Sequence, residues 1–202
     1  DSAGSQDRVY DINGLRVIAL DTSVTGYHHG AITDEQLAWL AAELTSPAKH
    51  GTVLAMHHPP LESHNPIVRL VELEQRDRLA PVIEGTDVRG ILAGHLHYST
   101  FGTFAGVPVA VASATCYTVD LGADQSFLLS AVDGGQTIDL VHVYADSLVH
   151  SIIPVEQYDQ VAGYPAALRA MADTMTEAEI REMVSSKTSE FNMAERQQSA
   201  DL

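Results

Sequence analysis

Four histidines follow two apolar runs of the chain, in positions from which imidazole rings could bind a metal ion. His57 and His58 follow the run "VLAM", and His95 and His97 follow the run "ILAG". Neutral imidazole nitrogen suits zinc, manganese, iron, nickel or copper. Residues two apart on an extended segment face the same way, so His95 and His97 could share one site. A hydrogen-bonded structural role is the alternative for any one histidine, but two clusters at equivalent places favour metal.

Both histidine pairs lie at the ends of segments that predict buried β-strands. Thr33 and Gln36 form a capping box, which predicts that a helix begins after the first strand. Alternating strands and helices predict a parallel sheet with helices on its faces, and such sheets bind ligands at the carboxyl ends of their strands. The expected elements are strands at 15–23, 51–58 and 88–97, a helix at 33–44, and a helix within 68–84 that Pro81 ends or kinks.

The pattern changes after residue 98, where short apolar segments separated by turns predict antiparallel strands. From about residue 156 the chain is polar and predicts helices, one of which begins at the capping box of Thr176 and Glu179. The final ten or so residues are expected to be disordered. The expected antiparallel strands are 100–104, 108–115, 126–132, 137–144 and 148–155.

The chain is acidic: its 202 residues carry a formal net charge of −16, from 27 acidic and 11 basic residues. This charge argues against binding to nucleic-acid polymers and to anionic membranes, because both need a basic surface. The one cysteine allows no internal disulfide. An oxidising compartment is therefore not required, and a cytoplasmic location is expected.

The two histidine motifs resemble those of the calcineurin-like metallophosphoesterases. "VLAMHHPP" and "ILAGHLHYST" carry the resemblance to the family as a whole. The longer segments 20–44 and 85–117 are similar to one branch, the class III cyclic-nucleotide phosphodiesterases of actinobacteria, including mycobacteria. The resemblance runs from about residue 8 to residue 155. It implies a metal-dependent phosphodiester hydrolase, with 2′,3′- or 3′,5′-cyclic nucleotides as the expected substrates.

The resemblance also implies a site and a fold. In the family two metal ions, here manganese, iron or zinc, share one centre. By the family pattern His57 and His95 would bind one metal and His97 the other, while His58 would lie behind the ligands or contact the substrate phosphate. The family fold is α/β, a four-layer αββα sandwich with two sheets between helices. Residues 1–155 would form the C-terminal portion of this domain, and residues 156–202 a helical extension.

Three motifs of the family do not occur in this sequence: Asp-x-His, Gly-Asp-x-x-Asp and Gly-Asn-His-Asp/Glu. In the family they precede the region seen here, and they supply the bridging aspartate, an asparagine ligand and the histidine thought to protonate the leaving group. The chain therefore resembles the C-terminal two-thirds of such an enzyme, with the amino-terminal βα units absent and the catalytic residues in the missing segment. We expect that segment, or a second copy of the chain in a dimer, to cover the open sheet. The alternative is a catalytically incomplete fragment that acts as a scaffold or a partial metal-binding or interaction module.

Other residues of suitable chemical type have weaker claims to a site. Asp21 ends a strand on the same edge of the sheet, where a turn-stabilising role is favoured. His28 and His29 are expected to have surface or structural roles. Cys116 is expected to be a small buried residue rather than a nucleophile, because no base can be assigned to it from the sequence. The histidines expected to be incidental are His64, His142 and His150.

Overall fold

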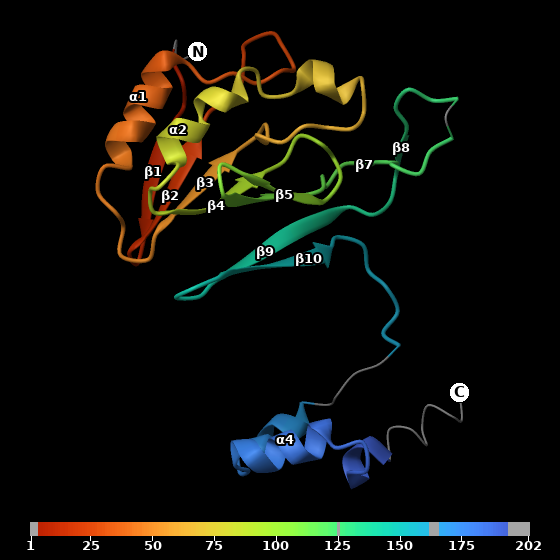
Figure 1. The fold of residues 1–202 in the computed structure, drawn as a ribbon. Coiled ribbons are helices and arrows are strands. Elements are labelled where there is room, and N and C mark those ends of the chain that lie inside the picture. The colour runs from red at the N-terminus through yellow and green to blue at the C-terminus, as the bar shows by residue number, and fades with distance from the viewer. Residues whose placement is uncertain (1–3, 125, 162–165, 194–202) are drawn as a thin grey trace. The chain divides into compact units, whose positions relative to one another are not determined.

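The computed structural model describes residues 4–124, 126–161 and 166–193. The chain divides into two compact units, residues 1–157 and residues 158–202. The first unit contains a six-stranded sheet with helices on one face, and the described part of the second is helical (Figure 1). The predicted α/β class is confirmed. That the first unit is the C-terminal portion of an enzyme domain, and the second an extension of it, stays a prediction.

Four parallel strands form the centre of the large sheet. The strands of this sheet are β1 (Arg8–Ile12), β2 (Leu15–Leu20), β3 (Thr52–Met56), β4 (Val88–Ala93), β5 (Thr100–Phe104) and β6 (Val107–Val111). Their spatial order is β1-β2-β3-β4-β6-β5. β2, β3 and β4 are parallel, as the alternation of elements predicts. β6 is antiparallel to β5, as expected, but it also pairs parallel with β4, which was not predicted. β1 and β5 are antiparallel edge strands. The sheet is therefore mixed.

Two tight turns make the antiparallel edges. Asn13 and Gly14 join β1 to β2 with φ of 55° and 94°, and the favoured two-residue hairpin turn requires positive φ at both positions. Ala105 and Gly106 join β5 to β6 in the same way, with φ of 48° and 78°. The second hairpin confirms the sequence prediction. The first was missed, although an Asn-Gly pair between two apolar segments is a hairpin signal.

Helix α1 (Asp34–Glu43) covers one face of the sheet. Its capping box forms as predicted, since the Gln36 amide donates to Thr33 Oγ1 and the Thr33 amide donates to Gln36 Oε1. Leu40 of α1 is fully buried and belongs to the same core as Ile18 of β2 and Leu54 of β3. Apolar contact between helix and sheet therefore holds these strands in place.

The helix expected within 68–84 is broken into pieces, so this prediction is wrong in its continuity. The pieces are two 3₁₀ turns, η1 (Val68–Val71) and η2 (Arg76–Arg78), and the short helix α2 (Ala80–Ile83). Gln75, with a left-handed φ of 49°, interrupts the helical backbone between the two turns. Pro81 lies in the first turn of α2. A proline there lacks only an N–H that would be unpaired anyway, so Pro81 begins a helix instead of ending one.

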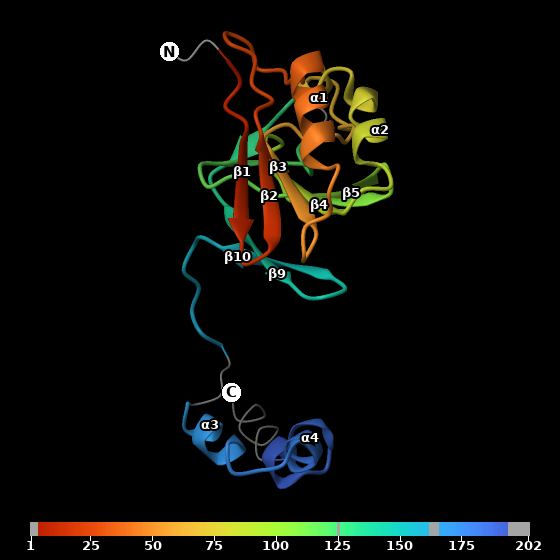
Figure 2. The same cartoon turned by 90° about the vertical axis from the view of Figure 1, so that its left-hand side faces the viewer.

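A β-hairpin lies against the face of the sheet opposite α1 and α2 (Figures 1 and 2). Its strands are β9 (Thr137–Val143) and β10 (Leu148–Pro154), and they pair antiparallel as predicted. Gly90 of β4 makes room for the hairpin, because a Cβ there would lie 2.6 Å from Leu148 Cδ1. Arg89 donates to two carbonyls in the turn of the hairpin. Helices, a mixed sheet and a second sheet element thus form three of the four layers expected of the sandwich within the described part of the first unit.

The strand expected at 126–132 is mostly absent. Only β8 (Ala131–Val132) forms, and it pairs with β7 (Thr118–Val119). The Ser126 amide donates to the carboxylate of Asp124, and this bond turns the chain before a strand can begin. The prediction is therefore wrong for most of this apolar segment.

The second unit contains helices α3 (Ala167–Ala172) and α4 (Glu177–Ser185). The predicted capping box of Thr176 and Glu179 begins α4 and is confirmed. The end that was expected to be disordered, residues 194–202, lies outside the described residues. Among the helices that the structure describes, none has the length and apolar character needed to cross a membrane.

We predict that Leu40→Ala lowers the free energy of unfolding by about 2–5 kcal/mol, because it leaves a cavity in a closely packed core. Leu70→Ala is the matched control, since the Leu70 side chain is 75% exposed and its loss should change stability by less than about 0.5 kcal/mol. Urea denaturation measures both values. Equal losses in the two variants would show that α1 does not hold the sheet as described.

Candidate metal centre

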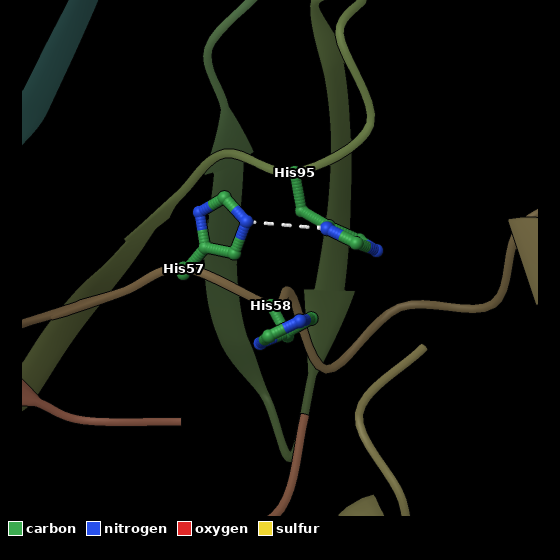
Figure 3. Close-up of side chains that lie close together, drawn as sticks. All are labelled: His57, His58 and His95. Atoms are coloured by element: carbon green, nitrogen blue, oxygen red, sulfur yellow. Dashed lines mark hydrogen bonds between the residues drawn. The ribbon is translucent and has the colours of Figure 1, made fainter. Parts of the chain in front are cut away.

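The carboxyl ends of β3 and β4 bring the predicted ligands together. The two strands are parallel neighbours, so His57 after β3 and His95 after β4 emerge at one edge of the sheet. The amide of Gly94 donates to the carbonyl of His57 over 3.0 Å and holds the two loops side by side. His57, His58 and His95 form a cluster in which one ring nitrogen of each lies within 4.8 Å of the others (Figure 3).

His57 and His95 are close enough to bind one ion. Nε2 of His57 lies 3.2 Å from Nδ1 of His95, and the rings are inclined at 75°. Two nitrogens bound to one zinc ion at about 2.0–2.1 Å are roughly 2.9–3.4 Å apart, for angles between about 90° and the tetrahedral value. The same separation suits a hydrogen bond when no metal is bound. The separation of the two nitrogens therefore suits two ligands of one ion.

His95 has an unusual backbone and an unpaired nitrogen. Its φ is 72°, in the left-handed region that residues with a side chain rarely adopt and that occurs preferentially at functional sites. Its Nε2 is buried and makes no regular hydrogen bond within the described residues. Burial lowers the pKa of His95 to about 4, the charges of His58 and His57 add to this, and the Val71 carbonyl opposes it. His95 is therefore neutral near pH 7, as a metal ligand must be.

His57 and His58 are also held in the neutral form, but only His57 is available to a metal. Partial burial lowers the pKa of His57, and the charge of His97 adds to the effect. Burial likewise lowers the pKa of His58. Both ring nitrogens of His58 are occupied, Nδ1 by the Thr22 hydroxyl at 2.8 Å and Nε2 by the His28 carbonyl at 3.0 Å. These bonds favour a place behind the ligands over contact with a substrate.

His97 lies apart from this cluster but lines the same cavity. Its ring packs on Tyr117 with centroids 4.3 Å apart, and its Nδ1 is 3.8 Å from Cys116 Sγ. Its φ of 58° is again left-handed. His57, His95 and His97 all line one cavity of about 490 Å³. The structure thus brings the three predicted ligands to one cavity, and the division of metals between them stays a prediction.

Cys116 and Asp21, two further residues considered for the site, differ in how well their predictions hold. Cys116 is exposed, so the expectation of a buried cysteine is wrong. The reason is that β6 ends at Val111, which leaves Cys116 in the following loop. Asp21 has the predicted turn-stabilising role, because its carboxylate accepts from the amide and hydroxyl of Ser23 and from the Gln6 amide. Burial raises the pKa of Asp21, but these bonds outweigh it and hold the pKa below its usual value.

The other histidines do not join the cluster within the described residues. His28 contributes its carbonyl rather than its ring, and His29 Nε2 lies 3.7 Å from a carboxylate oxygen of Glu74. Three others each lie beside an aromatic ring, His64 by Tyr98, His142 by Tyr144 and His150 by Phe101.

Two residues of the site were missed in the sequence. Thr22 is 1% exposed and bonds to His58. Asp139 of β9 lines the cavity, and one of its carboxylate oxygens is buried without a partner among the described residues. Only the fold brings β2 and β9 near the histidines, so no local pattern could have identified either residue.

The histidine pKa values predict that the metal-free protein loses stability in mild acid. The pKa of His95 is about 4 in the folded chain and about 6.5 when unfolded. The unfolded state therefore takes up the proton first, and stability present above pH 6.5 is lost as the pH falls toward 4. Urea denaturation with a chelator at about pH 7 and pH 5 should show this loss, and His95→Gln should reduce it.

The matched control for this prediction is His142→Gln, which alters an exposed histidine of β9 and should keep the pH dependence of the original chain. An equal dependence in the His95→Gln variant and in the original chain would contradict the prediction.

Comparisons with known proteins identify similar proteins that are named as phosphodiesterases. The chain is 51% identical over 181 residues to a probable cyclic nucleotide phosphodiesterase of Rhodococcus erythropolis, an alignment that covers 90% of this chain and 60% of that protein. It is 57% identical over 149 residues to the cAMP/cGMP dual specificity phosphodiesterase of Mycobacterium tuberculosis, covering 74% and 46%. It is 25% identical over 134 residues to the 3′,5′-cyclic adenosine monophosphate phosphodiesterase of Escherichia coli, covering 66% and 49%.

No protein-family model matches the chain. The chain spans from about half to three-fifths of the length of the relatives it matches. These comparisons confirm the resemblance that the histidine motifs predict: over most of its length the chain is similar to bacterial proteins named as cyclic nucleotide phosphodiesterases.

Proposed function

We propose that the protein to which this chain belongs hydrolyses phosphodiesters at a centre of two metal ions, with cyclic nucleotides as its substrate class. The observation that carries the proposal is the pair formed by His57 Nε2 and His95 Nδ1, 3.2 Å apart at the carboxyl ends of two parallel strands. The names of the relatives support the substrate class. A cytoplasmic location belongs to the same proposal, since one cysteine leaves no internal disulfide that needs an oxidising compartment.

The proposed roles follow from the position of each ring. His57 and His95 bind one ion, His97 binds the other, and His58 supports the first pair from behind. When bound, two such ions, manganese, iron or zinc, would lower the pKa of a water and stabilise both the attacking and the leaving oxygen. The lowered pKa values of His57 and His95 keep these ligands unprotonated near pH 7. The small side chains of Ala93 and Ala112 leave the cavity open beside them.

The chain needs carboxylates that its own cluster does not supply. In the part of the chain that the structure describes, the one group of residues close enough to hold an ion is His57, His58 and His95, with no carboxylate among them. Three neutral imidazoles cannot offset the charge of two divalent ions. We propose that a segment present in the longer relatives supplies the bridging carboxylate and the leaving-group acid.

The first test of this function is substitution in the longest natural protein that contains this chain. His57→Ala and His95→Ala should each lower kcat/KM for cyclic AMP by more than about 100-fold, since even residues behind metal ligands often contribute 10- to 100-fold. Metal analysis of the purified variants should show fewer bound ions. The matched control is His142→Ala on β9, which should keep both activity and metal content.

Cys116→Ala separates this mechanism from a thiol mechanism in the same assay. It should retain most of the turnover, because the proposed nucleophile is water. Loss of activity in a folded Cys116→Ala variant, with its metal content unchanged, would overturn the proposal.

The second test concerns the surfaces that this chain leaves open. β1 is an edge strand whose residues are all exposed, and β9 and β10 expose apolar side chains. An uncovered edge and apolar face favour association with another chain. We propose that the segment found in the longer relatives, or a second copy of the chain, covers them. The exposed apolar residues of the hairpin, between 39% and 50% accessible, are Ile138, Leu140, Val143, Val149, Ile152 and Ile153.

Light scattering after size-exclusion chromatography of the 202-residue chain checks this expectation. We expect a mass above the 21.7 kDa of one chain. A cooperative monomer of that mass would contradict the proposal that these surfaces require a cover.

A further inference from the structure

Thr22 lies directly behind the histidine cluster. It follows β2 by two residues and is 1% exposed. Its hydroxyl oxygen accepts from the backbone amide of His58 at 3.2 Å and lies 2.8 Å from Nδ1 of the same residue. Thr22 therefore holds both the backbone and the ring of His58.

The bonds of His58 determine where its proton lies. The His28 carbonyl, 3.0 Å from Nε2, can only accept, so Nε2 carries the proton. Nδ1 then has a free lone pair and accepts the hydroxyl proton of Thr22. Every donor and acceptor in this arrangement is satisfied when His58 is neutral. One tautomer and one ring orientation are thus selected by two neighbours that are not ligands.

His58 is also confined by packing. A Cβ at Gly30 would lie 2.4 Å from Cγ and Nδ1 of the His58 ring, so the ring rests directly on the Gly30 backbone. On its other side the ring meets His57 edge-on at 4.7 Å and His95 at 4.4 Å between centroids. Figure 3 shows the His58 ring beside the gap between these two side chains. A displacement of His58 would therefore displace the pair.

We propose that Thr22 and His58 are positioning residues for the metal centre: the Thr22 hydroxyl fixes the ring plane of His58, whose tautomer the His28 carbonyl selects, and the His58 ring holds His57 and His95 at the spacing that binds an ion. This inference rests on the proposed function. Positioning groups behind metal ligands typically contribute 10- to 100-fold to metal affinity. A role in folding alone would lower stability and leave metal affinity unchanged.

The test compares three threonine variants in the longest natural protein that contains this chain. Thr22→Val removes the hydroxyl at constant size, and Thr22→Ser keeps it. Thr52→Val is the matched control: Thr52 is fully buried on β3, and its hydroxyl bonds to Arg16 and Asp87, away from the histidines. Zinc affinity is measured by titration calorimetry, and the His58 tautomer by nitrogen-15 chemical shifts of the metal-free protein.

We expect Thr22→Val to weaken zinc binding by about 10- to 100-fold. It should also shift the nitrogen-15 resonance of His58 Nδ1, because Nδ1 loses its donor while the His28 carbonyl keeps the proton on Nε2. Thr22→Ser and Thr52→Val should stay within about threefold of the original protein. Unchanged zinc affinity in Thr22→Val, or an equal loss in Thr52→Val, would overturn the positioning role. Absence of zinc binding in the original protein would instead overturn the metal centre itself and this role with it.

Gly30→Ala decides the question if Thr22→Val does not fold. It removes no hydrogen bond and crowds His58 from the opposite side, so it should weaken zinc binding in the same range, about 10- to 100-fold. A folded Gly30→Ala protein with the original zinc affinity would overturn the proposal.

Discussion

The parallel pairing of β3 with β4 is the constraint on which the candidate site depends. Its register sets Ala55 beside Leu92, so both strands end at the same level. The fully buried Leu54 and Ile91 fix the same pair from the helix side. Packing thus decides which face each strand presents, and the loops that follow inherit their positions from it. The histidines are brought together by the sheet rather than by attraction between their rings.

Burial and hydrogen bonding act differently on the three clustered rings. At His95 burial dominates, and Nε2 makes no regular hydrogen bond among the described residues, whereas at His58 both nitrogens are satisfied. A buried polar atom without a partner is unfavourable, and a fully bonded one adds rigidity. The same local environment can therefore hold one histidine ready for a ligand and make its neighbour part of the scaffold.

The sequence was sufficient for the central strands, α1 and the convergence of His57 and His95, because apolar runs, a capping box and strand ends are local signals. It was insufficient where distant segments decide the outcome. The hydroxyl of Thr22 acquires its role only when β2 lies beside β3. Similarly, β6 ends at Val111 and leaves Cys116 exposed, although the strand was predicted to continue to residue 115. The prediction of a continuous helix before β4 was wrong because Gln75 adopts a left-handed backbone conformation, which no apolar pattern encodes.

The left-handed backbone at His95 and His97 has a consequence for how this loop can change over generations. Glycine adopts such φ values without steric conflict, whereas an imidazole-bearing residue does not. If stability alone were selected, substitution by glycine would be favoured at both positions. A requirement for the imidazole rings opposes that substitution. At these two positions the most stable residue for the fold differs from the residue that supplies an imidazole ring. A descendant that lost its chemistry should record the loss there first.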